Sequence, residues 1–336
     1  MIYWRLHLER TIPDAAKGGR LRRVIGVCYI EIAEDMSEHL LEGTVICGHG
    51  KHFVVYAAGK CYTCQMRKKV KFKTSLTTPV AVGDDVLISA AGENDGSIEE
   101  VRPRRSVLSR PTVGREDSEH VLAANIDALV IVASVDSPPL KPGLIDRFLI
   151  AAQLGNLAPF IVINKMDLHL DQASAEAIKI YQNLGFDLAL TSAQEGTGLD
   201  HLGRYLKDHR SILAGHSGVG KSTLLNRLLP GINLPAQEVS QVTGRGRHTT
   251  SHIEMFHLPD GGFVIDSPGL KVLGLWQAEK NGLDLYYPEM RSFREQCRFT
   301  HCSHLREPDC AVRDAVLRGE ISTLRYENYS HIYDSL

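Results

Sequence analysis

A glycine-rich loop at residues 215–222 constrains the fold of this 336-residue chain more than any other feature. Its sequence, GHSGVGKS, has the complete pattern G-x-x-x-x-G-K-[ST]. Such a loop joins a β-strand to a helix, and its backbone N–H groups surround phosphate oxygens at the helix N-terminus. A strand is expected at residues 211–214 and a helix at 221–229. The loop therefore predicts an α/β domain that binds a nucleotide on a parallel sheet.

The residues of the loop are expected to share the work of phosphate binding. Lys221 can reach the β- and γ-phosphates and assist catalysis, and the Ser222 hydroxyl can ligate Mg²⁺. The remaining backbone forms a nest for the phosphate oxygens. The predicted nucleotide-binding residues of this segment are Gly215, His216, Ser217, Gly218, Val219, Gly220, Lys221, Ser222 and Thr223.

A second motif, Asn164-Lys165-Met166-Asp167, follows an apolar run expected to form a buried strand at residues 159–163. The Asp167 carboxylate can accept hydrogen bonds from both N1–H and the 2-amino group of guanine, and adenine offers neither donor. The aliphatic stem of Lys165 can lie across the base. Alone, these four residues would also suit a turn that starts a helix. Ser192 and Ala193 follow the next expected strand, where the Ala193 N–H could donate to guanine O6.

Two switch elements are expected after the phosphate loop. Asp266-Ser-Pro-Gly269 resembles the D-x-x-G motif, in which Asp266 holds Mg²⁺ through water and the Gly269 N–H senses the γ-phosphate. Thr250 is the predicted switch threonine and Mg²⁺ ligand, with Thr249 as the alternative. Ras-type GTPases carry a water-positioning glutamine after D-x-x-G.

This chain has Leu270 at that position, so intrinsic hydrolysis should be slow. His248 could position the water instead; the alternative is an ordinary exposed loop histidine.

The order of these motifs is a rotation of the Ras-like order. Ras-like chains run from the phosphate loop through the switches to N-K-x-D, whereas here residues 164–167 and 192–193 come before residues 215–222. The nucleotide-binding domain is therefore predicted to be a circularly permuted GTPase domain.

The C-terminal region contains a predicted zinc site. Cys297, Cys302, His304 and Cys310 offer three thiolates and one imidazole, a closed tetrahedral set for one structural ion. His301 is an alternative ligand, and unrelated buried cysteines are the alternative to a site. Cys61 and Cys64 lie in an expected strand and are interpreted as reduced structural cysteines.

Four segments are predicted along the chain. Residues 1–42 form an N-terminal extension, 43–108 an OB-fold-like β-barrel that binds RNA, 109–280 the permuted GTPase domain, and 281–336 a mostly helical zinc-binding domain.

Two stretches lack acidic residues and could contact a phosphate backbone, although a solvated strand face and a charged linker would look the same. Their basic residues are Lys60, Arg67, Lys68, Lys69, Lys71 and Lys73 in the first, and Arg102, Arg104, Arg105, Arg110 and Arg115 in the second.

Composition places the protein in the cytoplasm. No apolar run approaches the ~20 residues of a membrane span, and no secretory signal is recognisable. Seven cysteines, an odd number, argue against a disulfide framework. A cytoplasmic monomer with no membrane partner is expected.

Taken together, the barrel, the permuted GTPase motifs and Cys-x4-Cys-x-His-x5-Cys resemble the RsgA (YjeQ) family of bacterial small-ribosomal-subunit biogenesis GTPases over about residues 43–330. The R-H-T-T segment at residues 247–250 and Leu270 also match. The resemblance implies GTP, GDP, Mg²⁺ and Zn²⁺ as cofactors, and the small ribosomal subunit with its 16S rRNA as partners. It further implies late subunit assembly with subunit-stimulated hydrolysis.

Two alternatives stay open. One is an RNA-binding assembly placeholder in which the nucleotide only sets conformation. The other is a permuted GTPase that acts on the large subunit.

Overall fold

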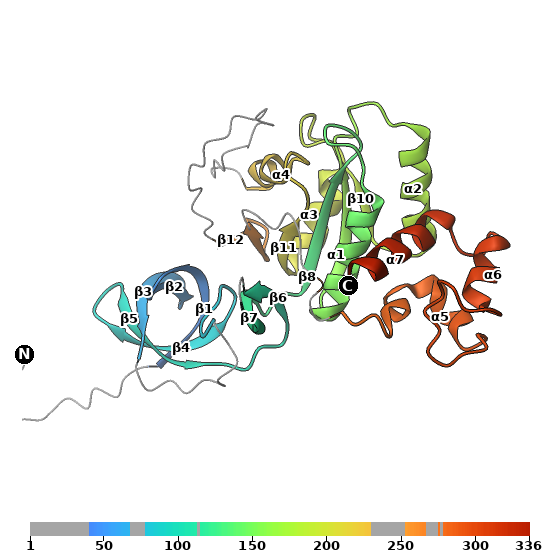
Figure 1. The fold of residues 1–336 in the computed structure, drawn as a ribbon. Coiled ribbons are helices and arrows are strands. Elements are labelled where there is room, and N and C mark those ends of the chain that lie inside the picture. Colours follow the sequence, from blue (N-terminus) through green and yellow to red (C-terminus); the bar gives the residue numbers. More distant parts are fainter. Residues whose placement is uncertain (1–39, 68–77, 113–114, 230–252, 267–274, 276–277) are drawn as a thin grey trace, which may run out of the picture. The chain divides into compact units, whose positions relative to one another are not determined.

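The structure is a computed structural model that describes residues 40–67, 78–112, 115–229, 253–266, 275 and 278–336 (Figure 1). Several residues predicted to be functional lie outside this part of the chain. They are His248, Thr249, Thr250, Gly269, Leu270, the lysines between residues 68 and 73, and nearly all of the N-terminal extension.

A closed five-stranded barrel begins the described chain. It consists of β1 (Leu40–His49), β2 (His52–Ala57), β3 (Lys60–Met66), β4 (Asp85–Ala91) and β5 (Asp95–Val101). The strand order is β1-β2-β3-β5-β4, and β4 pairs back to β1, which closes the barrel in the order of an OB-fold. Alternate side chains point inward and are fully buried, among them Val45, Val55, Cys64, Ile88 and Ile98. The predicted barrel is confirmed.

The Cys61 and Cys64 side chains leave β3 on opposite faces. Cys61 is exposed, and Cys64 is buried in the barrel core, where burial raises the pKa of its thiol to about 11. Two side chains three positions apart in a strand cannot converge on one ion, because successive residues alternate between faces.

A hairpin that the sequence did not reveal follows the barrel. β6 (Val107–Thr112) pairs antiparallel with β7 (Arg115–Ala124), and the hairpin spans the predicted boundary at residue 108. Leu108 and Val121 are buried within it.

The central α/β domain alternates strands and helices. Its elements are β8 (Ala128–Ser134), α1 (Pro142–Leu154), β9 (Ala158–Asn164), α2 (Gln172–Asn183), β10 (Leu188–Leu190), α3 (Leu199–Lys207), β11 (Arg210–Ala214), α4 (Lys221–Leu228), β12 (Glu254–His257) and β13 (Phe263–Asp266). The strand order is β10-β9-β8-β11-β13-β12, parallel except for β12, which also pairs with β1 at Cys47 and Glu254.

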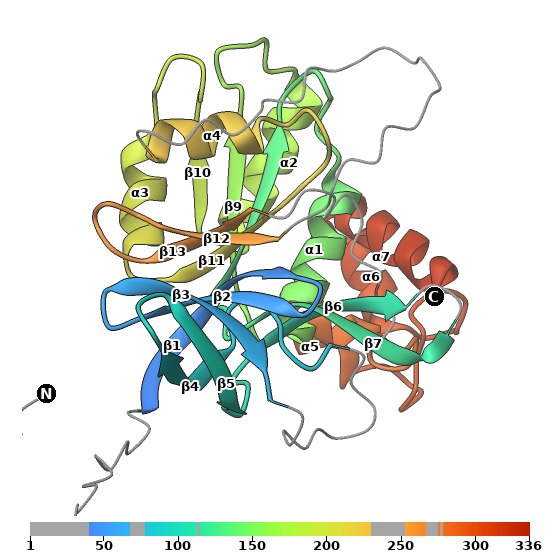
Figure 2. The same ribbon diagram turned by 90° about the vertical axis from the view of Figure 1, so that its left-hand side faces the viewer.

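The strand that leads into the phosphate loop, β11, therefore lies in the middle of this sheet between β8 and β13, although β8, β9 and β10 all precede it in the sequence. Alternate residues of β8 face two separate cores. Leu129 and Ile131 pack with α1, whereas Val130 and Val132 pack with α3 and α4 on the other face. Figure 2 shows the helices on both faces of the sheet.

The C-terminal module is helical and contains η1 (Leu283–Tyr286), α5 (Pro288–Arg294), α6 (Ala311–Leu317) and α7 (Thr323–Ser335). Helix α7 lies beside α1 in both views (Figures 1 and 2). Arg325 of α7 is buried between them, and it pairs with Asp146 of α1 and Glu289 of α5. Among the helices in the described part of the chain, none has the length and apolar character to cross a bilayer.

Candidate nucleotide and metal sites

The phosphate loop connects the end of β11 to the start of α4, as the motif requires. Gly215 has φ +150°, and a Cβ there would lie 2.1 Å from the Val132 carbonyl oxygen. Gly220 has φ +97°, and a Cβ there would lie 2.3 Å from Asn164 Nδ2. Both positions therefore require glycine for conformation and for space. The Lys221 ammonium donates to the carbonyl oxygens of Gly215, at 2.8 Å, and His216, at 3.0 Å, so it lies across the loop.

Asn164 joins the base motif to the phosphate loop. Its side chain is 1% exposed, and its Nδ2 donates to the Val219 carbonyl oxygen at 2.8 Å. Its Oδ1 accepts from the Thr191 hydroxyl at 3.1 Å and from the Ala193 N–H at 3.0 Å. One amide thus connects three segments that lie up to 55 residues apart in sequence.

The Ala193 N–H was expected to be available for guanine O6. In this structure it is already donated to Asn164, so a contact with O6 would have to be bifurcated or would have to replace that bond. The sequence could not reveal this competition, because it depends on the side-chain position of Asn164.

Asp167 and Lys165 lie where the base motif predicts. The Asp167 carboxylate accepts a hydrogen bond from the Ser192 hydroxyl, so the two segments predicted to recognise the base are in contact. Lys165 adopts φ +65° at the end of β9, and its ammonium donates to the Ser137 carbonyl oxygen. Burial lowers the pKa of Lys165, and the carboxylates of Asp136 and Asp167 oppose that effect.

Arg227 is a contact that the sequence gave no reason to single out. It lies on α4, six residues after Lys221, and donates to the Ala193 carbonyl oxygen at 3.0 Å and the Gln194 carbonyl oxygen at 2.7 Å. The helix that follows the phosphate loop thereby holds the Ser192-Ala193 segment.

The predicted magnesium site is only partly described. Ser222 is the second residue of α4, directly after Lys221, and the backbone of Asp266 ends β13, which pairs with β11 in the sheet. Thr250, Gly269 and His248 lie outside the described residues.

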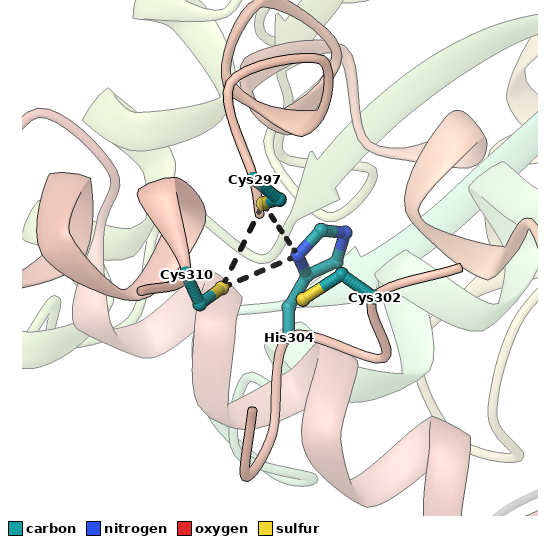
Figure 3. Close-up of side chains that lie close together, drawn as sticks. All are labelled: Cys297, Cys302, His304 and Cys310. Carbon is teal, nitrogen blue, oxygen red and sulfur yellow. Dashed lines mark hydrogen bonds between the residues drawn. The ribbon is translucent and has the colours of Figure 1, made fainter. Parts of the chain in front are cut away.

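The four predicted zinc ligands converge between α5 and α6 (Figure 3). Their ligand atoms all lie within 4.8 Å of one another. His304 Nδ1 is 3.6 Å from Cys297 Sγ and 3.4 Å from Cys310 Sγ, and the two sulfurs are 3.9 Å apart. In a tetrahedral site with Zn–S and Zn–N bonds of about 2.3 and 2.05 Å, these edges would be about 3.6 Å and about 3.8 Å. The donor set therefore fits zinc in both chemistry and dimensions.

Glu307 organises the loop that presents His304. Its carboxylate accepts backbone N–H groups of Ser303 at 2.8 Å, and of Leu305 and Arg306 at 3.2 Å each. Burial opposes ionisation of Glu307, but hydrogen bonds from the Ser303 side chain and from backbone N–H groups, including those of Ser303 and Arg306, outweigh it and lower the pKa of Glu307 to about 2. From α7, the Tyr326 hydroxyl donates to the His304 carbonyl oxygen at 2.7 Å. His301 is exposed and is not one of the four clustered residues.

Many of the predicted RNA-contacting arginines are engaged within the protein. Arg104 makes a bidentate pair with the buried Asp84, and Arg105 pairs with Asp127. Arg102 pairs with Glu42 and Glu100. These three side chains therefore support the linker interpretation of the second basic stretch. On the C-terminal module, Arg291, Arg294, Arg298 and Arg306 are expected to form a second RNA contact. Arg291, Arg298 and Arg306 are exposed, whereas Arg294 pairs with the buried Asp284, and Arg298 pairs with the exposed Asp309.

Comparison with known proteins decides the family. The profile of the RsgA GTPase family matches residues 101–276, and that of the RsgA N-terminal domain matches residues 42–98. The chain belongs to the RsgA GTPase family. It is therefore a GTP hydrolase, and its α/β domain is a circularly permuted GTPase domain.

Relatives with this architecture are similar over nearly their whole length. The small ribosomal subunit biogenesis GTPase RsgA of Actinobacillus pleuropneumoniae (serotype 5b, strain L20) is 39% identical, covering 91% of this chain and 88% of the relative. The protein of the same name from Haemophilus influenzae (strain PittEE) is 36% identical over 91% and 88% of the two chains.

Solved structures agree with this RsgA-family fold. YjeQ from Thermotoga maritima superposes with a TM-score of 0.72 at 33% identity, covering 88% of this chain and 98% of that one. YloQ, described as a circularly permuted GTPase, gives a TM-score of 0.68 at 28% identity, covering 90% and 97%.

Proposed function

We propose that this RsgA-family GTPase acts in the late assembly of the small ribosomal subunit, and that the subunit stimulates its hydrolysis of GTP. The observation that carries the proposal is the near full-length similarity to relatives named small ribosomal subunit biogenesis GTPases. A protein with that function would be located in the cytoplasm. We expect it to be a monomer, and we expect its four segments to have their boundaries at residues 42, 108 and 280.

In the proposed nucleotide complex, Asp167 reads the guanine edge and the phosphate loop of residues 215–223 holds the phosphates. Lys221 exchanges its carbonyl partners for phosphate oxygens, a change that costs little because the loop is already formed by its glycines. Ser222 and Thr250, with Asp266 through water, would hold Mg²⁺, which would supply positive charge next to the β- and γ-phosphates.

We propose that hydrolysis depends on an external stimulus because Leu270 cannot orient water. The proposal assigns His248 to that task when the small subunit makes the switch segment close on the nucleotide, with Thr250 as the magnesium ligand.

RNA contact is assigned to two surfaces. The barrel would supply the lysines between residues 68 and 73, since OB-folds bind structured and single-stranded RNA. The C-terminal module would supply the exposed Arg298 and Arg306.

Zinc is the proposed occupant of the cluster formed by Cys297, Cys302, His304 and Cys310. Four protein ligands leave no open coordination position, so the ion would be structural. It would hold α5, α6 and the intervening loop together.

Co-sedimentation with separated ribosomal subunits tests the partner. The protein should pellet with small subunits in a non-hydrolysable GTP analogue and less in GDP. Pelleting with large subunits instead would overturn the proposal. Multiple-turnover hydrolysis with and without small subunits then separates a stimulated enzyme from an assembly placeholder, for which the rates would be equal.

Elemental analysis of protein purified without chelator tests the metal. About one zinc per chain is expected. The matched variants are Cys297→Ser, which should lose zinc, and Cys61→Ser, which should keep it.

A further inference from the structure

His304 presents its two ring nitrogens to different partners. Nδ1 faces the cysteine sulfurs, at 3.4 and 3.6 Å. Nε2 lies 3.5 Å from Oδ2 of Asp284, a residue of the short helix η1. Both side chains are almost completely buried, with 2% of the His304 side chain and 5% of the Asp284 side chain exposed.

This arrangement matters because only one imidazole nitrogen can bind a metal through its lone pair while the other carries the proton. An acceptor at Nε2 favours the tautomer with Nε2–H and leaves the Nδ1 lone pair directed at the sulfurs. Metal-bound histidines generally donate their second N–H in this way, and the acceptor fixes the orientation of the ring and raises its basicity.

The charge balance at Asp284 is also complete. Arg294 Nε donates to the same Oδ2 at 2.6 Å, so the buried carboxylate has a cationic partner. Arg294 offsets part of the cost of placing a carboxylate next to zinc with three thiolates, which together would carry a net charge of −1.

We infer that Asp284 is a positioning residue of the zinc site, which accepts the Nε2–H of His304 and so makes Nδ1 the ligand atom. The inference rests on the proposed zinc site. It extends that site beyond the four ligands to Asp284 of η1, which lies thirteen residues before Cys297, the first ligand, in a segment without a motif of its own.

The affinity of full-length protein for zinc tests the inference, measured by competition with a chromogenic chelator. Asp284→Ala should weaken zinc binding by about 10–100-fold, the usual effect of removing such a partner. Asp284→Asn keeps an oxygen acceptor and should recover part of that loss. Arg294→Gln is the matched control, because it removes the other partner of Asp284 and leaves the acceptor, so its effect should be smaller.

A double variant separates positioning from general support of the fold. In a His304→Cys background the fourth ligand is a thiolate, which has no N–H to donate to Asp284. Adding Asp284→Ala in that background should therefore change zinc affinity little. An equal loss in both backgrounds, unchanged affinity in Asp284→Ala, or an Arg294→Gln effect as large as that of Asp284→Ala would overturn the inference. Absence of zinc from the unaltered protein would instead refute the zinc proposal.

Discussion

The buried ion network that joins α7 to the GTPase domain gives a quantitative prediction for Arg325→Met. Arg325 is 1% exposed and faces two carboxylates. It donates to Asp146, which is fully buried, and to Glu289 at 2.6 and 3.2 Å. Methionine would fill much of the volume but would leave both carboxylates without their cation. Removing one partner of a buried ion pair costs about 3–5 kcal/mol, so the free energy of unfolding should fall by that amount.

The size of the defect should depend on pH. Burial raises the pKa of Asp146, and the charge of Arg325 opposes that rise. Without Arg325 the pKa of Asp146 should increase further, so the folded variant would bind a proton that the unfolded chain releases near pH 4. Stability then decreases as pH rises, since the folded state holds more protons. The defect of Arg325→Met should therefore shrink as the pH is lowered from 7 to 5.

Urea unfolding followed by far-UV circular dichroism measures the loss, and hydrogen exchange locates it. Amides of α7 and α1 should exchange faster in Arg325→Met. Arg318→Met is the matched control, because Arg318 pairs with Glu320 on the surface with both side chains about half exposed. If the two variants had the same stability and exchange, the network would not hold the module to the GTPase domain.

Three further predictions concern the nucleotide site. Asp167→Asn should shift preference from guanine toward xanthine nucleotides and weaken GTP binding by about 1.5–3 kcal/mol, the contribution of a charged hydrogen bond; unchanged GTP affinity in a binding titration would remove Asp167 from base recognition. Arg227→Ala should weaken GTP and GDP binding alike, by about tenfold for about 1.4 kcal/mol of lost hydrogen bonding. Affinities equal to those of an Arg204→Ala control on α3 would contradict the role of Arg227 in holding the Ser192-Ala193 segment. His248→Ala should keep GTP affinity and the basal rate but lose most of the rate stimulated by saturating small subunits, and full stimulation would clear His248 of a catalytic role.

The motifs predicted the GTPase domain well because each residue in them has a local reason. Glycine is required at residues 215 and 220 by φ and by space, and both requirements appear in the sequence as a fixed pattern. Alternation in the barrel strands and continuous apolar runs in β8 and β9 are likewise local signals. The convergence of Cys297, Cys302, His304 and Cys310 followed from their spacing.

The structural features that the sequence did not predict depend on contacts between segments that are distant in the chain. The β6–β7 hairpin carries Pro111 and several charges, which obscure the alternation of a strand. Arg227, Asp284 and Arg325 are single residues whose partners lie 10 to 179 positions away. No pattern in one sequence identifies such partners. The pairing of Arg104 with Asp84 shows the opposite error, in which a basic stretch suggests an RNA contact although its side chain pairs with a carboxylate inside the protein.

The strand order also has a consequence for how the chain is made. β8, β9 and β10 form one half of the sheet and carry the predicted base-recognition residues, and β11, β13 and β12 form the other half with the phosphate loop. During synthesis the base half emerges first, and β8 remains an apolar edge until β11 arrives to pair with it. A guanine nucleotide bound at the proposed site would touch both halves, as the Asn164 side chain does, so it would stabilise only the completed sheet. GTP and GDP would thus bind only after β8 and β11 have paired. They would stabilise the complete sheet, but the nascent chain would have to form that pairing without help from the nucleotide.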